Sequence, residues 1–113
     1  VILIASGSEV ELAFKAADML SVQGYTARIV SMPSMELFDA QDEAYRESVL
    51  PKAIRARVAI EAGATFGWHK YVGLDGAVVG RGASGPQATL FKEMGFTPEH
   101  VAEVALSVIR AQQ

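Results

Sequence analysis

The sequence predicts a three-layer α/β/α fold around a mostly parallel (mixed) sheet of four to five strands. Short apolar runs rich in β-branched residues recur along the chain, as in strands that are buried on both faces. Stretches with apolar residues at helical spacing separate these runs. Strands that alternate with helices are joined by right-handed crossovers, so we expect a parallel sheet with helices on both of its faces.

The first part of the chain contains two predicted strands and the helix between them. Val1–Ala5 is a continuous apolar run, and Ser8 with Glu11 three residues later has the pattern of a capping box. The helix that follows carries an apolar stripe at Val10, Ala13, Phe14, Ala17 and Leu20. Gly24 lies just after it, where a left-handed residue ends many helices. Tyr25–Met32 is the second strand.

The rest of the chain continues the alternation. Ser34–Asp39 is predicted to be a turn with a short helical piece, and Asp42–Leu50 a polar helix that ends before Pro51. Strands follow at Arg57–Ile60 and Ala77–Val79, with an aromatic, irregular stretch at Trp68–Leu74 between them. Two helices complete the chain: Pro86–Met94, then one with Thr97 as N-cap, Pro98 at its first position and a stripe at Val101, Val104, Ala105 and Val108.

Length and composition indicate one ordinary globular domain that spans residues 1–113. The net charge is −3 and no cluster of Lys and Arg is present, which argues against a nucleic-acid partner. No apolar run approaches the roughly 20 residues of a membrane span, so we expect no membrane partner. The absence of cysteine agrees with a cytoplasmic protein. Because the chain opens inside an apolar run without Met, we expect that it was cut from a longer one.

The glycine-rich segment Gly80–Gly85 has the G-x-G-x-x-G spacing of a dinucleotide fingerprint. That fingerprint needs a following strand and an acidic residue about 20 positions further on, which holds the ribose. Only helices are expected after this segment, and Glu103, at about that distance, falls inside the last one. A turn from a strand into a helix is the better interpretation. The same residues read G-x-S-G-P and so depart from the G-x-S-x-G of a nucleophile elbow.

This loop is nevertheless where we predict a weak anion site, formed by Gly80, Arg81, Gly82, Ser84 and Gly85. Its glycines leave backbone amides open, the arginine adds positive charge, and a helix is expected directly afterwards. The turn Ser6–Ser8 has similar backbone freedom, but Glu9 and Glu11 in the next helical turn would repel an anion. We therefore expect an anion at the glycine-rich loop before the earlier turn.

The remaining polar residues form no catalytic or metal-binding pattern. Two distant histidines without cysteine do not make a zinc site, and the acids near residue 40 lack the spacing of a calcium loop. We expect these acids to form a solvated face: Glu36, Asp39, Asp42, Glu43 and Glu47. No catalytic, cofactor-binding or metal-ligating residue is assigned.

A series of specific strings runs in order along nearly the whole chain. They are Gly7-Ser8-Glu9-Val10, Ser31-Met32-Pro33-Ser34, then Phe38, Gln41 and Tyr45, Ser48-Val49-Leu50-Pro51, Arg57–Gly63, Trp68–Gly73, Gly82-Ala83-Ser84, Leu90-Phe91 and Gly95-Phe96-Thr97. In this combination they resemble the carboxy-terminal domain of transketolases. The family usually carries an aromatic residue directly before Gly-Ala-Ser, and here Arg81 stands there, which leaves the packing and length of this loop open.

The resemblance implies a homodimeric parent enzyme that transfers a two-carbon ketol unit between ketose and aldose phosphates in the pentose phosphate pathway. It also implies thiamine diphosphate and a divalent cation such as Mg²⁺, held between the amino-terminal domain of one subunit and the middle domain of the other. The family's catalytic residues belong to those two domains, so the resemblance transfers none of them to this chain. The fragment alone would be inactive, and its partners would be the remaining domains of the parent chain.

Two other interpretations stay open at this point. The chain could be an independent anion-binding, ligand-binding or regulatory α/β module, or the carboxy-terminal domain of a different thiamine diphosphate enzyme. An intact reading frame separates them, because both thiamine-dependent interpretations require a Gly-Asp-Gly segment followed at a distance by Asn-Asn upstream.

Overall fold

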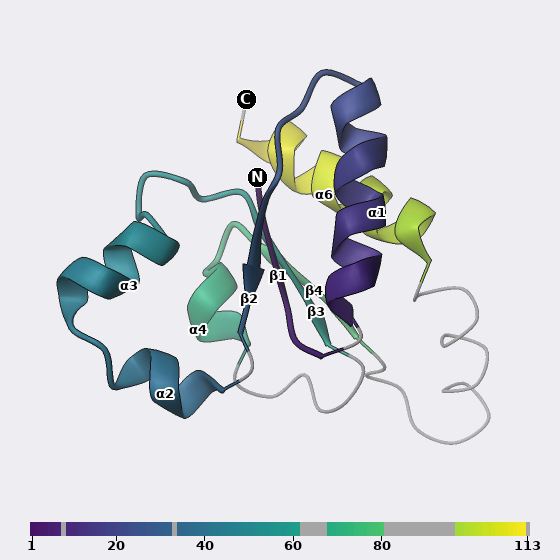
Figure 1. The fold of residues 1–113 in the computed structure, drawn as a ribbon. Helices are drawn as coiled ribbons and strands as arrows, with labels where there is room; N and C mark the ends of the chain where they lie inside the picture. The colour runs from purple at the N-terminus through teal and green to yellow at the C-terminus, as the bar shows by residue number, and fades with distance from the viewer. Residues whose placement is uncertain (8, 33, 62–67, 81–96, 113) are drawn as a thin grey trace.

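Four parallel strands form the sheet at the centre of the computed structural model, which describes residues 1–7, 9–32, 34–61, 68–80 and 97–112. The strand order is β2-β1-β3-β4, with β1 at Ile2–Ala5, β2 at Arg28–Ser31, β3 at Arg57–Glu61 and β4 at Ala77–Gly80. Helices cover both faces of this sheet (Figure 1). The predicted three-layer fold is confirmed, and every strand pair in the described part of the chain is parallel.

The sheet separates two hydrophobic cores, because successive side chains of a strand point to opposite faces. On one face Leu3 packs in the core beneath the two long helices, α1 (Glu9–Val22) and α6 (Pro98–Ala111). On the other face Ile4 belongs to a second core, which includes aromatic residues that follow β3. All four residues of β1 are fully buried, as the continuous apolar run predicts for a central strand.

The two long helices begin and end where local sequence signals place them. Gly24, just after α1, has a φ of 91°, and the Tyr25 amide donates to the Leu20 carbonyl at 3.0 Å. At the start of α6, the Thr97 hydroxyl accepts a hydrogen bond from the His100 amide at 3.1 Å, with Pro98 in the first turn. Helices α1 and α6 pack against one another on the same face of the sheet (Figure 1).

Three short helices lie on the opposite face: α2 (Met35–Asp39), α3 (Glu43–Val49) and α4 (His69–Val72). Ser34 caps α2, and the Asp42 carboxylate caps α3 by accepting the Tyr45 amide at 2.8 Å. Neither α2 nor α3 contains a buried residue. The two short helical pieces that the sequence predicts here are confirmed.

Local differences from the sequence-based expectation have identifiable causes. The second strand begins at Arg28 instead of Tyr25, because the backbone at Tyr25 is still bonded to the end of α1. The stretch after Trp68, predicted to be irregular, contains the one-turn helix α4. Phe14, expected in the core-facing stripe of α1, is 57% exposed. The predicted cap at Ser8 and the predicted helix Pro86–Met94 lie outside the described residues.

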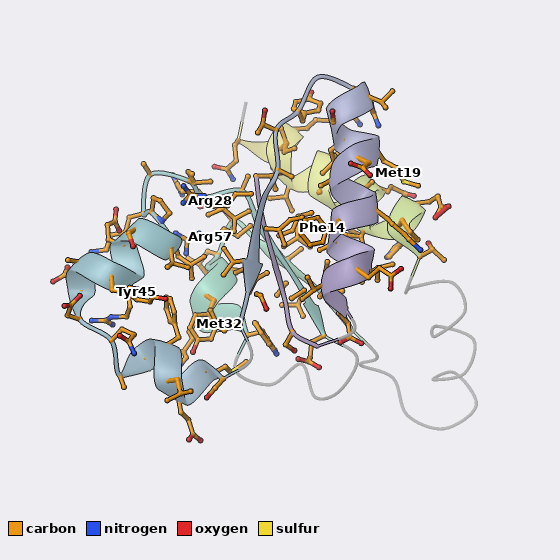
Figure 2. The ribbon with its side chains drawn as sticks, viewed as in Figure 1. Phe14, Met19, Arg28, Met32, Tyr45 and Arg57 are labelled. Carbon is orange, nitrogen blue, oxygen red and sulfur yellow. The ribbon has the colours of Figure 1, made fainter. Side chains whose placement is uncertain are left out.

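Phe14 is exposed because the buried stripe of α1 runs through Ala13, Ala16 and Leu20. Its ring therefore lies at the margin of that stripe, and in Figure 2 it extends from α1 toward the edge strand β2. On the opposite face of the same edge, Leu37 is 67% exposed and Tyr45 is 50% exposed. The outer edge of β2 is thus flanked by large apolar side chains.

Candidate functional site

A cleft of about 390 Å³ opens beside α3 and α4, on the face of the sheet that carries the short helices. Its walls come from the stretch between residues 38 and 57 and from α4, which lies further along the sequence. The first part supplies Phe38, Asp39, Glu43, Arg46, Glu47, Leu50, Lys52 and Arg57, and α4 supplies Lys70 and Tyr71. Most of these side chains are charged.

Arg57 is the best-connected of the cleft's cations. Its Nε donates to the Ile54 carbonyl at 2.9 Å, and its Nη1 donates to the Tyr71 carbonyl at 2.7 Å. Its Nη2 donates to the carbonyls of Leu50 at 3.2 Å and Pro51 at 2.7 Å. Burial lowers the pKa of this guanidinium from its usual value. One half-buried side chain therefore joins the end of α3, the following turn and α4 (Figure 2).

Asp39, at the end of α2, is held by two residues of α4. Lys70 Nζ donates to one carboxylate oxygen at 2.5 Å, and the Tyr71 hydroxyl donates to the other at 2.9 Å. The hydrogen bond from Lys70 lowers the pKa of Asp39, and the same bond raises the pKa of Lys70. Burial, followed by the bond to Asp39, raises the pKa of Tyr71. Asp39 is exposed, as expected of a solvated face, and it also connects α2 to α4.

Aromatic rings complete this connection between α2 and α4. The rings of Phe38 and Tyr71 meet edge to face with centroids 5.8 Å apart, and Trp68 meets Tyr71 in a similar way at 5.9 Å. The Lys70 ammonium also lies 5.1 Å from the centroid of the Tyr71 ring. Tyr71 itself is only 4% exposed, so it forms the floor of the cleft where α2 and α4 meet.

Replacing Asp39 by asparagine should lower the free energy of unfolding by up to about 1 kcal/mol near pH 7, because the carboxylate is 41% exposed and the ion pair is screened. The pKa of Asp39 lies below its usual value of 3.8 in the folded chain, so the native state binds this proton less tightly than the unfolded state. The contribution is therefore present above 3.8 and is lost as the pH falls through the lowered pKa.

Urea unfolding at several pH values checks this expectation. The stability difference between the parent chain and Asp39→Asn should shrink as the pH falls from about 7 to about 3. A difference that stays constant over this range would show that the carboxylate's charge contributes nothing. Asp18→Asn is a matched control, since Asp18 is exposed on α1 far from the cleft.

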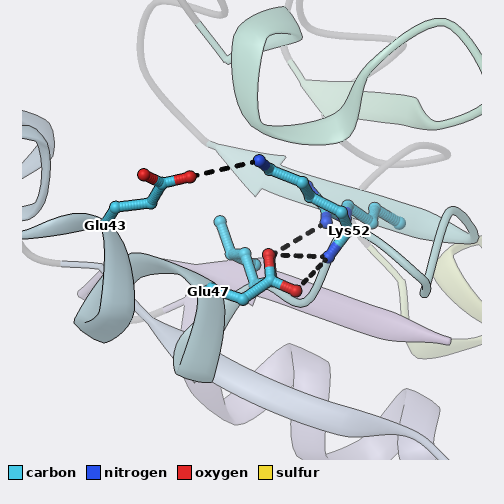
Figure 3. Close-up of polar contacts among 5 residues, drawn as sticks. Glu43, Glu47 and Lys52 are labelled. Atoms are coloured by element: carbon cyan, nitrogen blue, oxygen red, sulfur yellow. Dashed lines mark hydrogen bonds and ion pairs between the residues drawn. The ribbon is translucent and has the colours of Figure 1, made fainter.

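Two further acids meet one lysine on the opposite wall of the cleft (Figure 3). Both carboxylate oxygens of Glu47 accept the Lys52 amide at 3.1 Å, which fixes the turn after α3. Glu43 lies 3.5 Å from Lys52 Nζ, and both of these side chains are about four-fifths exposed, with values of 78% and 80%. These acids therefore also contact donors, although each remains open to solvent.

The polar side chains of the cleft mainly connect α2, α3 and α4 to one another and to the turn after α3. Among the described residues no group of three or more His, Cys, Asp or Glu side chains could hold a metal ion. The acids of the cleft are already engaged with lysines, a tyrosine hydroxyl or a backbone amide, and no Ser, Thr or Cys is among the described residues that line it. The donor set does not fit thiamine diphosphate with its divalent cation.

The anion site predicted from the sequence lies largely outside the described residues. Gly80 ends β4, whereas Arg81, Gly82, Ser84 and Gly85 are not described, so that site stays a prediction. At the earlier turn the Ser6 hydroxyl donates to a Glu61 carboxylate oxygen at 3.1 Å.

Comparison with known proteins decides the family. Residues 1–97 match the family model described as the transketolase-like TK C-terminal domain. The chain belongs to this family. It is 58% identical over 111 residues to Transketolase 1 of Pasteurella multocida and 56% identical to Transketolase 1 of Escherichia coli, matches that cover 96% of this chain and 17% of each relative.

Solved structures place the transketolase C-terminal domain in the same fold. The transketolase from Leishmania mexicana is 43% identical with a TM-score of 0.80, and the match covers 97% of this chain and 16% of that one. The chain therefore spans about a sixth of the length of the transketolases it matches. Within the described residues no helix is long and apolar enough to cross a membrane.

In this transketolase C-terminal domain, the strings that carried the resemblance supply half of the residues that line the cleft. Phe38, Leu50 and Arg57 come from three of them, and Lys70 and Tyr71 come from the string that begins at Trp68. The strings alone indicate no site, because no spacing in the sequence shows that α2, α3 and α4 come together. The one signal for the cleft in the sequence is the dense mixture of acidic and basic residues between positions 39 and 57.

Proposed function

We propose that this chain is the non-catalytic carboxy-terminal domain, residues 1–113, of a transketolase with two upstream domains that bind thiamine diphosphate. The parent enzyme would transfer a two-carbon ketol unit between ketose and aldose phosphates in the pentose phosphate pathway. The match of residues 1–97 to the family model carries this proposal. It is supported by relatives named transketolase, and by a cleft whose acids are engaged in holding helices together.

The parent would be a cytoplasmic homodimer, as the family resemblance implies, with thiamine diphosphate and a divalent cation bound outside this domain. In that setting the domain's immediate partner is the rest of its own polypeptide. The outer edge of β2 is the surface we assign to this contact, since β2 pairs with β1 on one side only in the described sheet. Phe14 on one face and Tyr45 on the other, both at least half exposed, would become buried there.

Calorimetry with thiamine diphosphate and Mg²⁺ tests the non-catalytic role. We expect no heat above that of dilution for the isolated chain, because no described residue set can ligate a metal-bound diphosphate. Micromolar binding by this chain alone would contradict the assignment of roles. A second check is the intact gene, which should encode Gly-Asp-Gly followed at a distance by Asn-Asn upstream of Val1.

The independent regulatory module is not favoured, because the matched relatives are transketolases about six times as long as this chain. The separate question of the anion loop is answered by a phosphate titration followed by amide NMR. Shifts centred on Gly80–Gly85 that vanish in Arg81→Ala are the expected sign of weak binding at that loop. Shifts centred on Ser6–Ser8 would argue against it.

A further inference from the structure

The cleft beside α3 and α4 has the size and the chemistry of a small-molecule site. Its volume of about 390 Å³ lies in the usual range of ligand pockets, roughly 300–1,000 Å³. Among the described side chains, those with shifted pKa values are Asp39, Arg57, Lys70 and Tyr71, and all of them line this cleft. Such clustering in a concave site is typical of functional sites.

The hydrogen bonds of the cleft leave donors in excess of acceptors. Asp39 is bonded at both oxygens, and both oxygens of Glu47 accept a backbone amide. The Arg57 guanidinium donates its hydrogen bonds to backbone carbonyls. Among the described residues no carboxylate lies within hydrogen-bond distance of it.

Arg46 supplies the strongest of these spare donors. Its guanidinium makes no hydrogen bond or ion pair with any residue that the structure describes, although it faces the same cleft. Lys52 adds an ammonium whose carboxylate contact, with Glu43, is long at 3.5 Å and exposed. The cleft carries four cationic and three acidic side chains, which leaves one positive charge to be matched.

We propose that this cleft binds a small organic oxyanion, a phosphate ester or a carboxylate, with its charged group on Arg46 and Lys52 and its body against Phe38 and Tyr71. The planar guanidinium fork matches either oxyanion in a two-point contact. The partly exposed ring of Phe38 offers an apolar wall on which a ring-bearing body can pack, and the nearly buried ring of Tyr71 closes the floor beneath it. The acidic side chains around the cleft select against ligands with more than two negative charges, because like charges repel at short range.

Titration of the ¹⁵N-labelled chain with phenyl phosphate, benzoate and inorganic phosphate tests the proposal. We expect saturable amide shifts at Arg46, Lys52 and Tyr71 with phenyl phosphate or benzoate, and the tighter of the two identifies the preferred oxyanion. Inorganic phosphate, which has no body to pack on the rings, should bind about ten-fold more weakly. Equal affinity of inorganic phosphate and phenyl phosphate would overturn the part assigned to Phe38 and Tyr71.

Two arginine variants distinguish binding in the cleft from a general effect of the protein's charge. Arg46→Gln should weaken the preferred ligand about ten-fold, since it removes a charged two-point contact. Arg110→Gln removes the same charge from an exposed site on α6 and should leave the affinity unchanged. The proposal is overturned if Arg46→Gln, shown by circular dichroism to be folded, binds as the parent does. Shifts centred on Gly80–Gly85, or no saturation by about 20 mM, would overturn it as well.

Discussion

Arg57→Ala should lower the free energy of unfolding by about 3 kcal/mol, which is large for a single polar residue. The Arg57 guanidinium donates to four backbone carbonyls between 2.7 and 3.2 Å, and these belong to Ile54, Tyr71, Leu50 and Pro51. Truncation would leave partly buried carbonyls without a donor, and each such group costs about 1–3 kcal/mol unless water reaches it. The loss should therefore exceed that of any exposed ion pair in this chain.

Urea unfolding followed by tryptophan fluorescence measures the effect directly. Trp68 is the only tryptophan and is 3% exposed, so its emission reports the core beneath α4. Arg55→Ala is the matched control, because Arg55 is exposed and its ion pair with Asp75 should contribute less than about 1 kcal/mol. Arg57→Lys should recover only part of the loss, since an ammonium cannot reach all four carbonyls. Equal stabilities for the two alanine variants would disprove the role of Arg57.

Leu20→Ala should cost about 3 kcal/mol of unfolding free energy, by a different mechanism. Leu20 is fully buried in the core that α1 shares with α6 and the sheet. Removal of a buried leucine side chain loses its transfer free energy and leaves a cavity that the surroundings fill only in part, at a cost of about 2–5 kcal/mol. The same urea experiment measures it, with little change expected in the slope against denaturant.

Val22→Ala, on the same helix, is the control for Leu20→Ala. Val22 is 88% exposed, so the substitution removes almost no buried surface. Alanine is also the better helix former, so the change in stability should stay within about 0.5 kcal/mol of zero. If Leu20→Ala were as mild as Val22→Ala, the packing of α1 against α6 described above would be wrong.

The sheet could be predicted from the sequence because its signal is local and repeated. Val1–Ala5 is apolar at every position, and a run of that kind is compatible with few structures other than a central strand. The ends of elements were harder to predict. Tyr25 is an aromatic residue of the kind that favours strands, but its amide closes the turn that ends α1 at Gly24, so the strand begins only at Arg28. A single helical turn such as α4 is too short for a helical period to be visible.

The cleft could not be predicted, because its residues belong together only after folding. Asp39 and Lys70 are 31 positions apart in sequence and form an ion pair at 2.5 Å. From the sequence alone the acids between Glu36 and Glu47 resembled an ordinary solvated face, which is the commoner arrangement for a run of charges. Burial of apolar residues is subject to the same limit. Helical spacing predicts that Phe14 belongs to the apolar stripe of α1, but it does not show that Phe14 lies at the exposed margin of that stripe.

The way α2 and α3 are attached has a consequence for how the molecule opens. Neither helix contributes a buried residue, and side chains hold both of them: Asp39 to α4, and Arg28 and Arg57 to backbone carbonyls at the end of α3. Segments with little buried apolar surface unfold locally at a small part of the global free energy. Residues 35–49 should therefore exchange their amide hydrogens through a separate, earlier opening than β1, which exchanges only when the whole sheet comes apart. A ligand bound in the cleft would stabilise the folded form of residues 35–49 and slow their amide exchange. The exchange rates in β1 would still depend on the stability of the whole sheet.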